Sequence, residues 1–216
     1  MAKKDPQLGR RVHLRLEELN LETPFTEEGP QMAAEETIEH AFTQIMKSLG
    51  LDLKDEGLAG TPKRVAKMFR NEIFEGMEYH SFPSCTSENN GFDADSMVIV
   101  GDISVASTCM HHFQNIEGVA KVAYIPNKKV LGLSKFNRIV RFFSKRPQIQ
   151  ERLTLQIQAA LCLILGTEDV AVEIRAIHHC VKARGIEDKN SFTTTRKLGG
   201  KFKATEAVRN EFLNSK

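Results

Sequence analysis

Hydrophobic positions recur with a helical period through the first third of the chain. Apolar residues three or four positions apart predict a short helix over residues 8–19, an amphipathic helix over 32–49 and a third helix over 61–76. Thr61-Pro62 is typical of an N-cap followed by a proline in the first helical turn. This part of the chain is therefore predicted to be helical.

The pattern changes after residues 81–95, which are rich in Ser, Asn, Gly and Asp and predict a loop. Beyond this loop, β-rich runs alternate with stretches of helical spacing. The predicted strands cover residues 97–107, 119–126, 169–180 and 191–195. The predicted helices begin at Ser134, Pro147 and Thr205, and Gly166 ends the second of them.

The segment 169–180 has the clearest alternation in the chain. Its even positions from 170 to 176 are apolar, whereas Glu173 and Arg175 occupy odd positions. Period-two geometry places His178 and Cys180 on the apolar face and turns His179 away from it. The strand therefore predicts Cys180 as a metal ligand, with His178 beside it.

A second group of possible ligands lies far from Cys180 in the sequence, at Cys109 and His112. A thiol and an imidazole three residues apart are typical of zinc sites, and three protein ligands leave the fourth tetrahedral position for water, as in catalytic sites. Two other interpretations are a buried thiol beside an unrelated histidine and a disulfide. The pattern favours a Zn²⁺ hydrolytic enzyme.

Charge and composition narrow the choice of partners. The 216 residues include 30 basic and 28 acidic ones, for a net charge of +2, so no bulk attraction to nucleic acid or membrane is expected. Basic residues follow both halves of the predicted metal site, at Lys135 and Arg138 and at Lys182 and Arg184. Solvated surfaces often carry such residues, but their repetition beside one site indicates an anionic substrate.

Several signals are missing from the sequence. The chain contains no Gly-x-x-x-x-Gly-Lys-Ser/Thr motif, so a phosphorylated substrate must be held by separate Lys and Arg side chains. No stretch has the features of a signal peptide or the roughly 20 apolar residues of a membrane span. Four cysteines in this length fit a reducing compartment, and we expect a cytoplasmic protein.

We expect three regions along the chain. Residues 1–30 form a polar segment with a short helix, interrupted at Thr23-Pro24 and Gly29-Pro30. Residues 31–95 form a helical region and a loop, and residues 96–216 form the catalytic region. One large domain, or a domain with an appendage, is typical of this length.

Five motifs carry a resemblance to GTP cyclohydrolase I, in the same order from about Met32 to Phe212. They are Thr61-Pro62-x-Arg64-Val65-Ala66-Lys67-Met68, Ser107-Thr108-Cys109-Met110-His111-His112-Phe113, Gly132-Leu133-Ser134-Lys135-Phe136-Asn137-Arg138, Arg146-Pro147-Gln148-Ile149-Gln150-Glu151-Arg152-Leu153 and His178-His179-Cys180-Val181-Lys182-Ala183-Arg184-Gly185. The resemblance implies an α+β tunnelling fold (T-fold), in which helices cover one side of an antiparallel sheet, with further N-terminal helices. It also implies a homodecamer with sites between subunits.

The activity that the resemblance implies is the zinc-dependent conversion of GTP to 7,8-dihydroneopterin triphosphate and formate, the first step of tetrahydrofolate and pterin biosynthesis. The matching positions are the zinc ligands Cys109, His112 and Cys180, the catalytic histidines His111 and His178, the guanine-recognition pair Gln150 and Glu151, and the ribose and triphosphate contacts Ser134, Lys135, Arg138, Arg184 and Lys67. Imidazoles suit the proton transfers because they titrate near neutral pH.

Two positions depart from the family pattern. Met110 lies between two zinc ligands where the family usually has Glu, and His179 stands where an apolar or aromatic residue is common. A thioether cannot replace a carboxylate as a charge partner. An active enzyme is the leading interpretation, and a zinc- and GTP-binding paralogue with low turnover, acting in assembly or regulation, is the alternative. Near-neutral charge disfavours a structural zinc module that binds nucleic acid.

Overall fold

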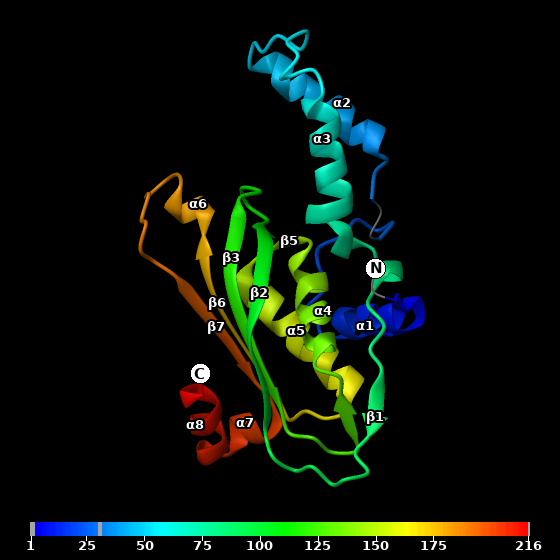
Figure 1. Cartoon of the computed structure of the whole chain (residues 1–216), viewed down its shortest axis with the longest axis vertical. Coiled ribbons are helices and arrows are strands. Elements are labelled where there is room, and N and C mark those ends of the chain that lie inside the picture. The colour runs from blue at the N-terminus through cyan, green and yellow to red at the C-terminus, as the bar shows by residue number, and fades with distance from the viewer. Residues whose placement is uncertain (1–2, 30–31, 216) are drawn as a thin grey trace.

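A curled sheet with helices packed against it, and a helical arm projecting from one end, make up the computed structural model, which describes residues 3–29 and 32–215 (Figure 1). Pro30, placed at a predicted chain break, and the expected boundary between residues 30 and 31 lie outside the described residues. The strands are β1 (Ser87–Asn89), β2 (Val98–Cys109), β3 (Asn115–Tyr124), β4 (Lys129–Leu131), β5 (Pro147–Gln148), β6 (Val170–His178) and β7 (Thr193–Leu198).

The helices alternate with these strands in the second half of the chain and precede them in the first. They are α1 (Pro6–Glu18), α2 (Glu35–Ser48), α3 (Thr61–Met68), α4 (Ser134–Ser144), α5 (Gln150–Leu165), α6 (His179–Lys182), α7 (Gly200–Ala204) and α8 (Glu206–Asn214). A π-helical turn η1 (Phe69–Ile73) and two 3₁₀ turns, η2 (Glu75–Met77) and η3 (Tyr79–Ser81), connect α3 to the strands.

The main sheet has the order β5-β2-β3-β6-β7. Strands β2, β3, β6 and β7 pair antiparallel, as predicted, but β5 runs parallel to β2, with Pro147 opposite Thr108 and Gln148 opposite Cys109. The expectation of a wholly antiparallel sheet is therefore wrong at this edge. Pro147 also does not start a helix, because the chain stays extended through Ile149 and α5 begins at Gln150.

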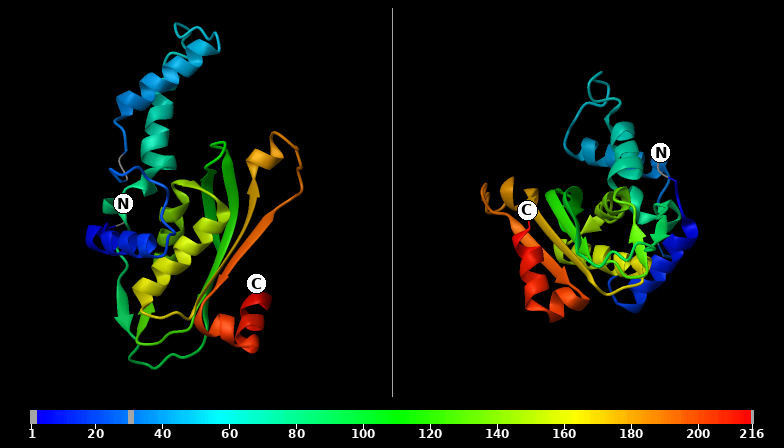
Figure 2. Two further views of the ribbon diagram at one scale, coloured as in Figure 1. Left: turned by 180° about the vertical axis from the view of Figure 1, so that it is seen from behind. Right: turned by 60° about the horizontal axis from the view of Figure 1, so that its bottom comes forward.

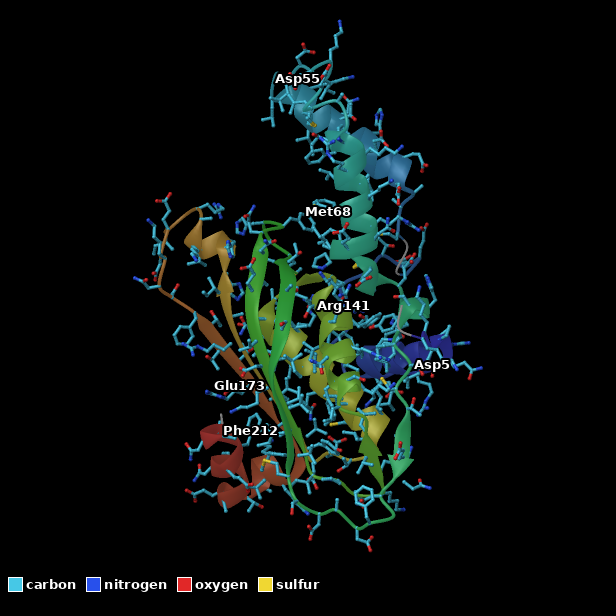
Figure 3. All side chains as sticks on the ribbon, viewed as in Figure 1. Asp5, Asp55, Met68, Arg141, Glu173 and Phe212 are labelled. Carbon is cyan, nitrogen blue, oxygen red and sulfur yellow. The ribbon has the colours of Figure 1, made fainter. Side chains whose placement is uncertain are left out.

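Both faces of the sheet carry helices. The apolar alternation of β6 is confirmed, since Val172, Ile174 and Ala176 are buried in the main core, which also includes residues of α4 and α5. Helices α7 and α8 lie on the opposite face, as two views of the ribbon show (Figure 2). The expectation that helices cover one side only is therefore wrong. Paired Ala123 and Ala171 are small enough to let the rings of Phe202 in α7 and Phe212 in α8 pack against the strands, and Figure 3 labels Phe212 where α8 lies next to the sheet.

The arm consists of α2 and α3, packed on each other with Asp55 at the tip and Met68 near the base (Figure 3). Helical structure continues from α3 through η1, in agreement with the predicted helix over 61–76. Thr61 is the first helical residue and Gly60 the cap, so the predicted N-cap is one position off. Arg70 at the base donates to the backbone carbonyl of Ala33 at 2.6 Å and so ties the two ends of the arm together.

Smaller differences concern caps and the 81–95 segment. Gly166 ends α5 in a left-handed conformation with φ of 67°, as predicted. Ser134 is the first residue of α4 rather than its cap. Residues 81–95 are not wholly a loop, because β1 pairs with β4. No helix within residues 3–29 and 32–215 has both the length and the apolar character needed to span a bilayer.

Candidate metal centre and substrate site

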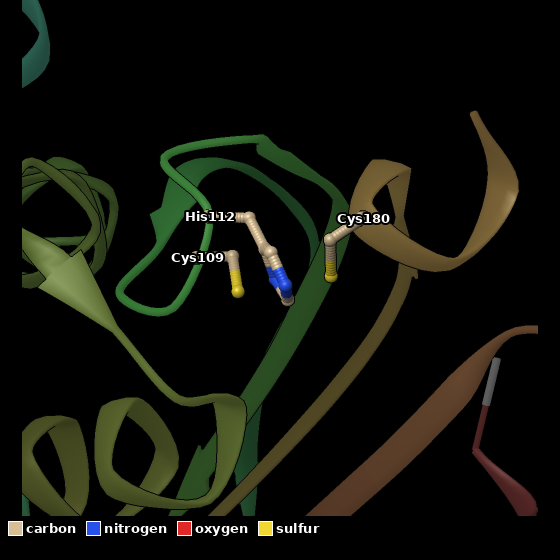
Figure 4. A group of neighbouring side chains, drawn as sticks. All are labelled: Cys109, His112 and Cys180. Atoms are coloured by element: carbon tan, nitrogen blue, oxygen red, sulfur yellow. The ribbon is translucent and has the colours of Figure 1, made fainter. Parts of the chain in front are cut away.

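Two segments that are about 70 residues apart in the sequence meet at one end of the sheet. The ligand atoms of Cys109, His112 and Cys180 all lie within 4.8 Å of one another, and this is the metal-binding group found among the described residues (Figure 4). Cys109 is buried, Cys180 is half-buried and His112 is exposed. The prediction that Cys109 and His112 lie close to Cys180 is therefore confirmed.

The first half is a tight reversal between β2 and β3. The Cys109 N–H donates to the Gln114 carbonyl at 2.8 Å, and the Phe113 N–H donates to the Cys109 carbonyl at 2.9 Å. Phe113 has a φ of 50°, a left-handed conformation that the reversal requires. The Met110 N–H donates to the Gln148 carbonyl of β5 at 2.9 Å, so the neighbouring strand also holds this turn.

The second half follows β6. The predicted strand over 169–180 is two residues too long at its carboxyl end, because β6 stops at His178 and the chain turns into α6. Cys180 reaches the metal group from this helical turn rather than from an extended strand. His179 is directed away, as predicted, and its Nε2 lies 3.3 Å from a carboxylate oxygen of Glu117 on β3.

The donor set fits Zn²⁺. Two thiolates and one imidazole are soft-to-borderline ligands that zinc accepts in tetrahedral sites, and three of them leave one position open. Burial and the adjacent Cys109 thiol raise the pKa of the Cys180 thiol, because two thiolates this close repel each other. A divalent cation between the sulfurs reverses that repulsion and favours both thiolates.

His178 is held beside the metal group by Gln150. The Gln150 amide nitrogen lies within 3.1 Å of three acceptors on Ile174, Thr193 and Thr195, so its Oε1 faces His178 Nε2 at 2.8 Å. The amide orientation assigns the proton to Nε2 and leaves Nδ1 free. Burial lowers the pKa of His178, although the Glu151 carboxylate opposes this shift.

Other predicted residues lie at the same end of the sheet. His111 is exposed, with its Nδ1 3.8 Å from Cys109 Sγ. Glu151 is exposed in the first turn of α5, next to the buried Gln150. Arg184 is exposed after α6 and close enough to Cys180 for its positive charge to favour the thiolate. Within one chain, His111 therefore lies next to Cys109, Arg184 lies near Cys180, and Glu151 lies near His178.

The remaining predicted residues lie elsewhere. Ser134 and Lys135 begin α4, whereas its carboxyl end leads to β5 and the metal turn, so the 11 residues of α4 put about 16 Å between them and that end. Arg138 lines a cavity of about 830 Å³ together with Lys4 and His80; none of the metal-site side chains is among its described lining residues. Lys67 is exposed on α3 of the arm.

Sequence reasoning missed the residues that support this site. Arg146 and Gln148 are fully buried polar residues before α5, and Thr195 closes the set of acceptors around Gln150. The resemblance motif includes the first two, but only the sheet register reveals that Gln148 lies opposite Cys109. Thr195 gives no signal beyond a run of threonines on β7.

Comparison with known proteins shows which family the chain resembles in sequence. The sequence model of the family described as GTP cyclohydrolase I matches residues 38–216. The chain is 54% identical to GTP cyclohydrolase 1 of Erwinia tasmaniensis, with 94% of each chain covered. It is 54% identical to that of Aeromonas salmonicida over 94% of this chain and 93% of the relative. With the protein of Shewanella loihica the identity is 50%, over 97% and 98%.

Proposed function

The chain belongs to the GTP cyclohydrolase I family, and we propose that Cys109, His112 and Cys180 hold the Zn²⁺ with which it converts GTP to 7,8-dihydroneopterin triphosphate and formate. The observation that carries this proposal is the meeting of the three ligand atoms beside the oriented His178. When bound, Zn²⁺ would act as a Lewis acid that lowers the pKa of a water molecule toward neutrality.

His178 and His111 are the proposed proton carriers. Gln150 fixes the Nε2 proton of His178, so protons enter and leave this ring at Nδ1. Burial lowers the pKa of His178 and so favours the neutral ring, the form that can accept a proton. The return of a proton as the purine ring opens and formate leaves is assigned to His111, and its exposed position beside Cys109 supports this role.

Guanine recognition is assigned to Gln150 and Glu151. The exposed Glu151 carboxylate accepts hydrogen bonds from N1–H and the 2-amino group of guanine, whereas adenine offers no such pair of donors. The Gln150 side chain is already occupied with His178 and β7, so it supports the base pocket by fixing what surrounds Glu151. Glu151 therefore supplies the charged acceptor, and Gln150 fixes the position of the residues around it.

The triphosphate is assigned to Lys67, Lys135, Arg138 and Arg184, with Ser134 beside the ribose. Arg184 lies near the metal group of its own chain, while the other four residues come from α4 and the arm. This separation supports a site completed by another subunit, in a homodecamer of tunnelling-fold (T-fold) chains. Residues 96–216 then supply the catalytic region and residues 31–95 the arm that carries Lys67. We place the enzyme in the cytoplasm.

The direct test is turnover. Zinc-loaded protein incubated with GTP should release formate and give a product that becomes fluorescent neopterin after oxidation. Protein stripped of metal with a chelator is the control, and it should regain activity when Zn²⁺ is restored. Tight GTP and zinc binding without formate release would instead favour the low-turnover paralogue.

A further inference from the structure

The carboxyl-terminal part of α1 and the residues that follow it, 13–23, are fixed to the core by a buried ion pair. Arg146 is 0% exposed, and its guanidinium donates to a carboxylate oxygen of Glu22 at 3.2 Å and to the Gly76 carbonyl. The other Glu22 oxygen accepts from the Tyr79 hydroxyl at 2.5 Å and lies 2.7 Å from His13 Nδ1. Because a buried guanidinium needs a compensating charge, Glu22 holds residues 13–23 in place.

A second buried connection starts one residue earlier. The Gln156 side-chain amide of α5 donates to the Leu21 carbonyl at 2.8 Å, and its Oε1 accepts from Gln148 Nε2 at 2.8 Å. Gln148 Nε2 also donates to the Phe143 carbonyl at 2.9 Å. Both glutamines are 0% exposed, so neither amide has water as an alternative partner.

The same Gln148 contacts the metal turn through its backbone. Its carbonyl accepts from the Met110 N–H at 2.9 Å, and in the sheet register it lies opposite Cys109. A continuous path of hydrogen bonds therefore runs from Leu21 through Gln156 and Gln148 to the residue between two predicted zinc ligands. Packing brings α1 against α5 along this path (Figures 1 and 2).

Loss of one hydrogen bond in this path would leave the Gln148 side chain poorly oriented. Among the described residues, Gln148 Oε1 has no hydrogen-bond partner, so the Gln148 amide is oriented only through its Nε2. Without the Gln156 acceptor, that nitrogen keeps a single partner and the side chain gains freedom to rotate. The backbone of Gln148 would then hold the Met110 N–H, and with it the turn, less firmly.

We propose that Gln156 and Glu22 are positioning residues for the metal centre, and that residues 13–23 raise zinc affinity without touching the metal group. The proposal rests on the proposed zinc site. It assigns a role to a segment that precedes the residues matched by the family's sequence model, which begin at 38. The physical basis is that supporting hydrogen bonds fix the orientation of ligand-bearing backbone and so tune affinity.

The test compares two buried glutamines of the same helix. Gln156→Leu breaks the path, whereas Gln158→Leu removes another buried amide, which is 6% exposed and whose nitrogen donates locally, to Cys162 Sγ. Zinc affinity is measured by competition with a chromophoric chelator, and the unfolding midpoint of each metal-free protein is measured in parallel. We expect Gln156→Leu to weaken zinc binding about tenfold and Gln158→Leu to leave it within about twofold of wild type.

Equal zinc affinity in both variants, with similar losses of stability, would overturn the proposal. If Gln156→Leu does not fold, Glu22→Gln replaces it, with the exposed Glu18→Gln on the same segment as control. We expect at least about threefold weaker zinc binding for Glu22→Gln only, and unchanged binding overturns the proposal equally. Cys180→Ser distinguishes failure of the proposed zinc site from failure of the positioning role. If this variant still binds zinc fully, the zinc site is wrong, whatever the results for the glutamine variants.

Discussion

The two ends of α4 differ in how many of the predicted site residues lie together within one chain. At its carboxyl end, one chain brings together three metal ligands, an oriented histidine and an exposed carboxylate. At its amino-terminal end, Ser134 and Lys135 begin the helix and Arg138 lines a cavity, and none of the three belongs to the metal group. Under the proposed function, the metal chemistry is assembled within one chain, whereas Lys67, Lys135 and Arg138 reach the anionic substrate from a second chain.

Sheet register explains why the metal end is complete. Cys109 lies at the end of β2 and His178 at the end of β6, and both strands pair with β3 in a register that puts Ile116 opposite His178. A slip of one residue would turn the ligands to the other face, so the buried faces of these strands fix the centre. In the part of the chain that the structure describes, no strand pairing links α4 to the arm that carries Lys67.

The largest effect is expected at the complete end. Cys180→Ser removes one of three ligands, and we expect zinc binding and GTP turnover to fall by more than about a hundredfold, beyond the range for supporting residues. Zinc content by atomic emission and formate release measure the two quantities. Cys85→Ser is the control, because Cys85 is a half-buried thiol outside the metal group, with its pKa raised to about 11 by burial. Full zinc occupancy in Cys180→Ser would break the assignment.

Base selection should also belong to the complete end. Glu151→Gln keeps the shape but loses a charge-assisted acceptor, which costs on the order of 1.5–3 kcal/mol and so roughly ten- to a hundredfold in kcat/KM for GTP. Inosine triphosphate, which lacks the 2-amino group, is the matched substrate, and it should lose less. Unchanged GTP turnover would mean that guanine is recognised by other groups.

How far the sequence predicts the molecule depends on whether the signal is local. The alternation of β6 and the Cys-x-x-His turn are local patterns, and both elements are present. The parallel pairing of β5 and the position of α7 and α8 depend on contacts between distant segments, which no local period encodes. Family resemblance supplies the role of Gln150, but its bond to His178 depends on the meeting of α5 with β6.

At the amino-terminal end of α4, the test removes one positive charge. Arg138→Ala should weaken GTP binding by roughly tenfold and guanosine binding much less, because only the triphosphate offers anionic oxygens. Arg141→Ala is the matched control one turn further along α4, since Arg141 lines the same cavity but pairs with Glu75 at 2.7 Å. Calorimetric titration of both ligands measures the effect, and equal losses for GTP and guanosine would indicate a folding defect instead.

Mixing variants tests whether the metal group and the α4 residues that serve one substrate site come from different chains. Cys180→Ser and Arg138→Ala, each impaired alone, should regain about a quarter of wild-type activity when unfolded together in equal amounts and reassembled, because a quarter of the sites then receive both intact halves. Refolding each variant alone is the control. Absence of any recovery would place both halves in one chain and remove the contrast between the ends of α4.

The smallest effect is expected at Met110. Its backbone N–H is held by the Gln148 carbonyl, and the flanking Cys109 and His112 belong to the metal group, so substitution changes a side chain on a fixed turn. If the Glu usual in the family acts only through nearby charge, Met110→Glu should alter kcat/KM by less than about tenfold, or roughly 1.4 kcal/mol. Formate release by the wild type and the variant, at equal zinc content, measures this. A rescue of a hundredfold or more would show that the complete end lacks an essential carboxylate and would favour the low-turnover paralogue.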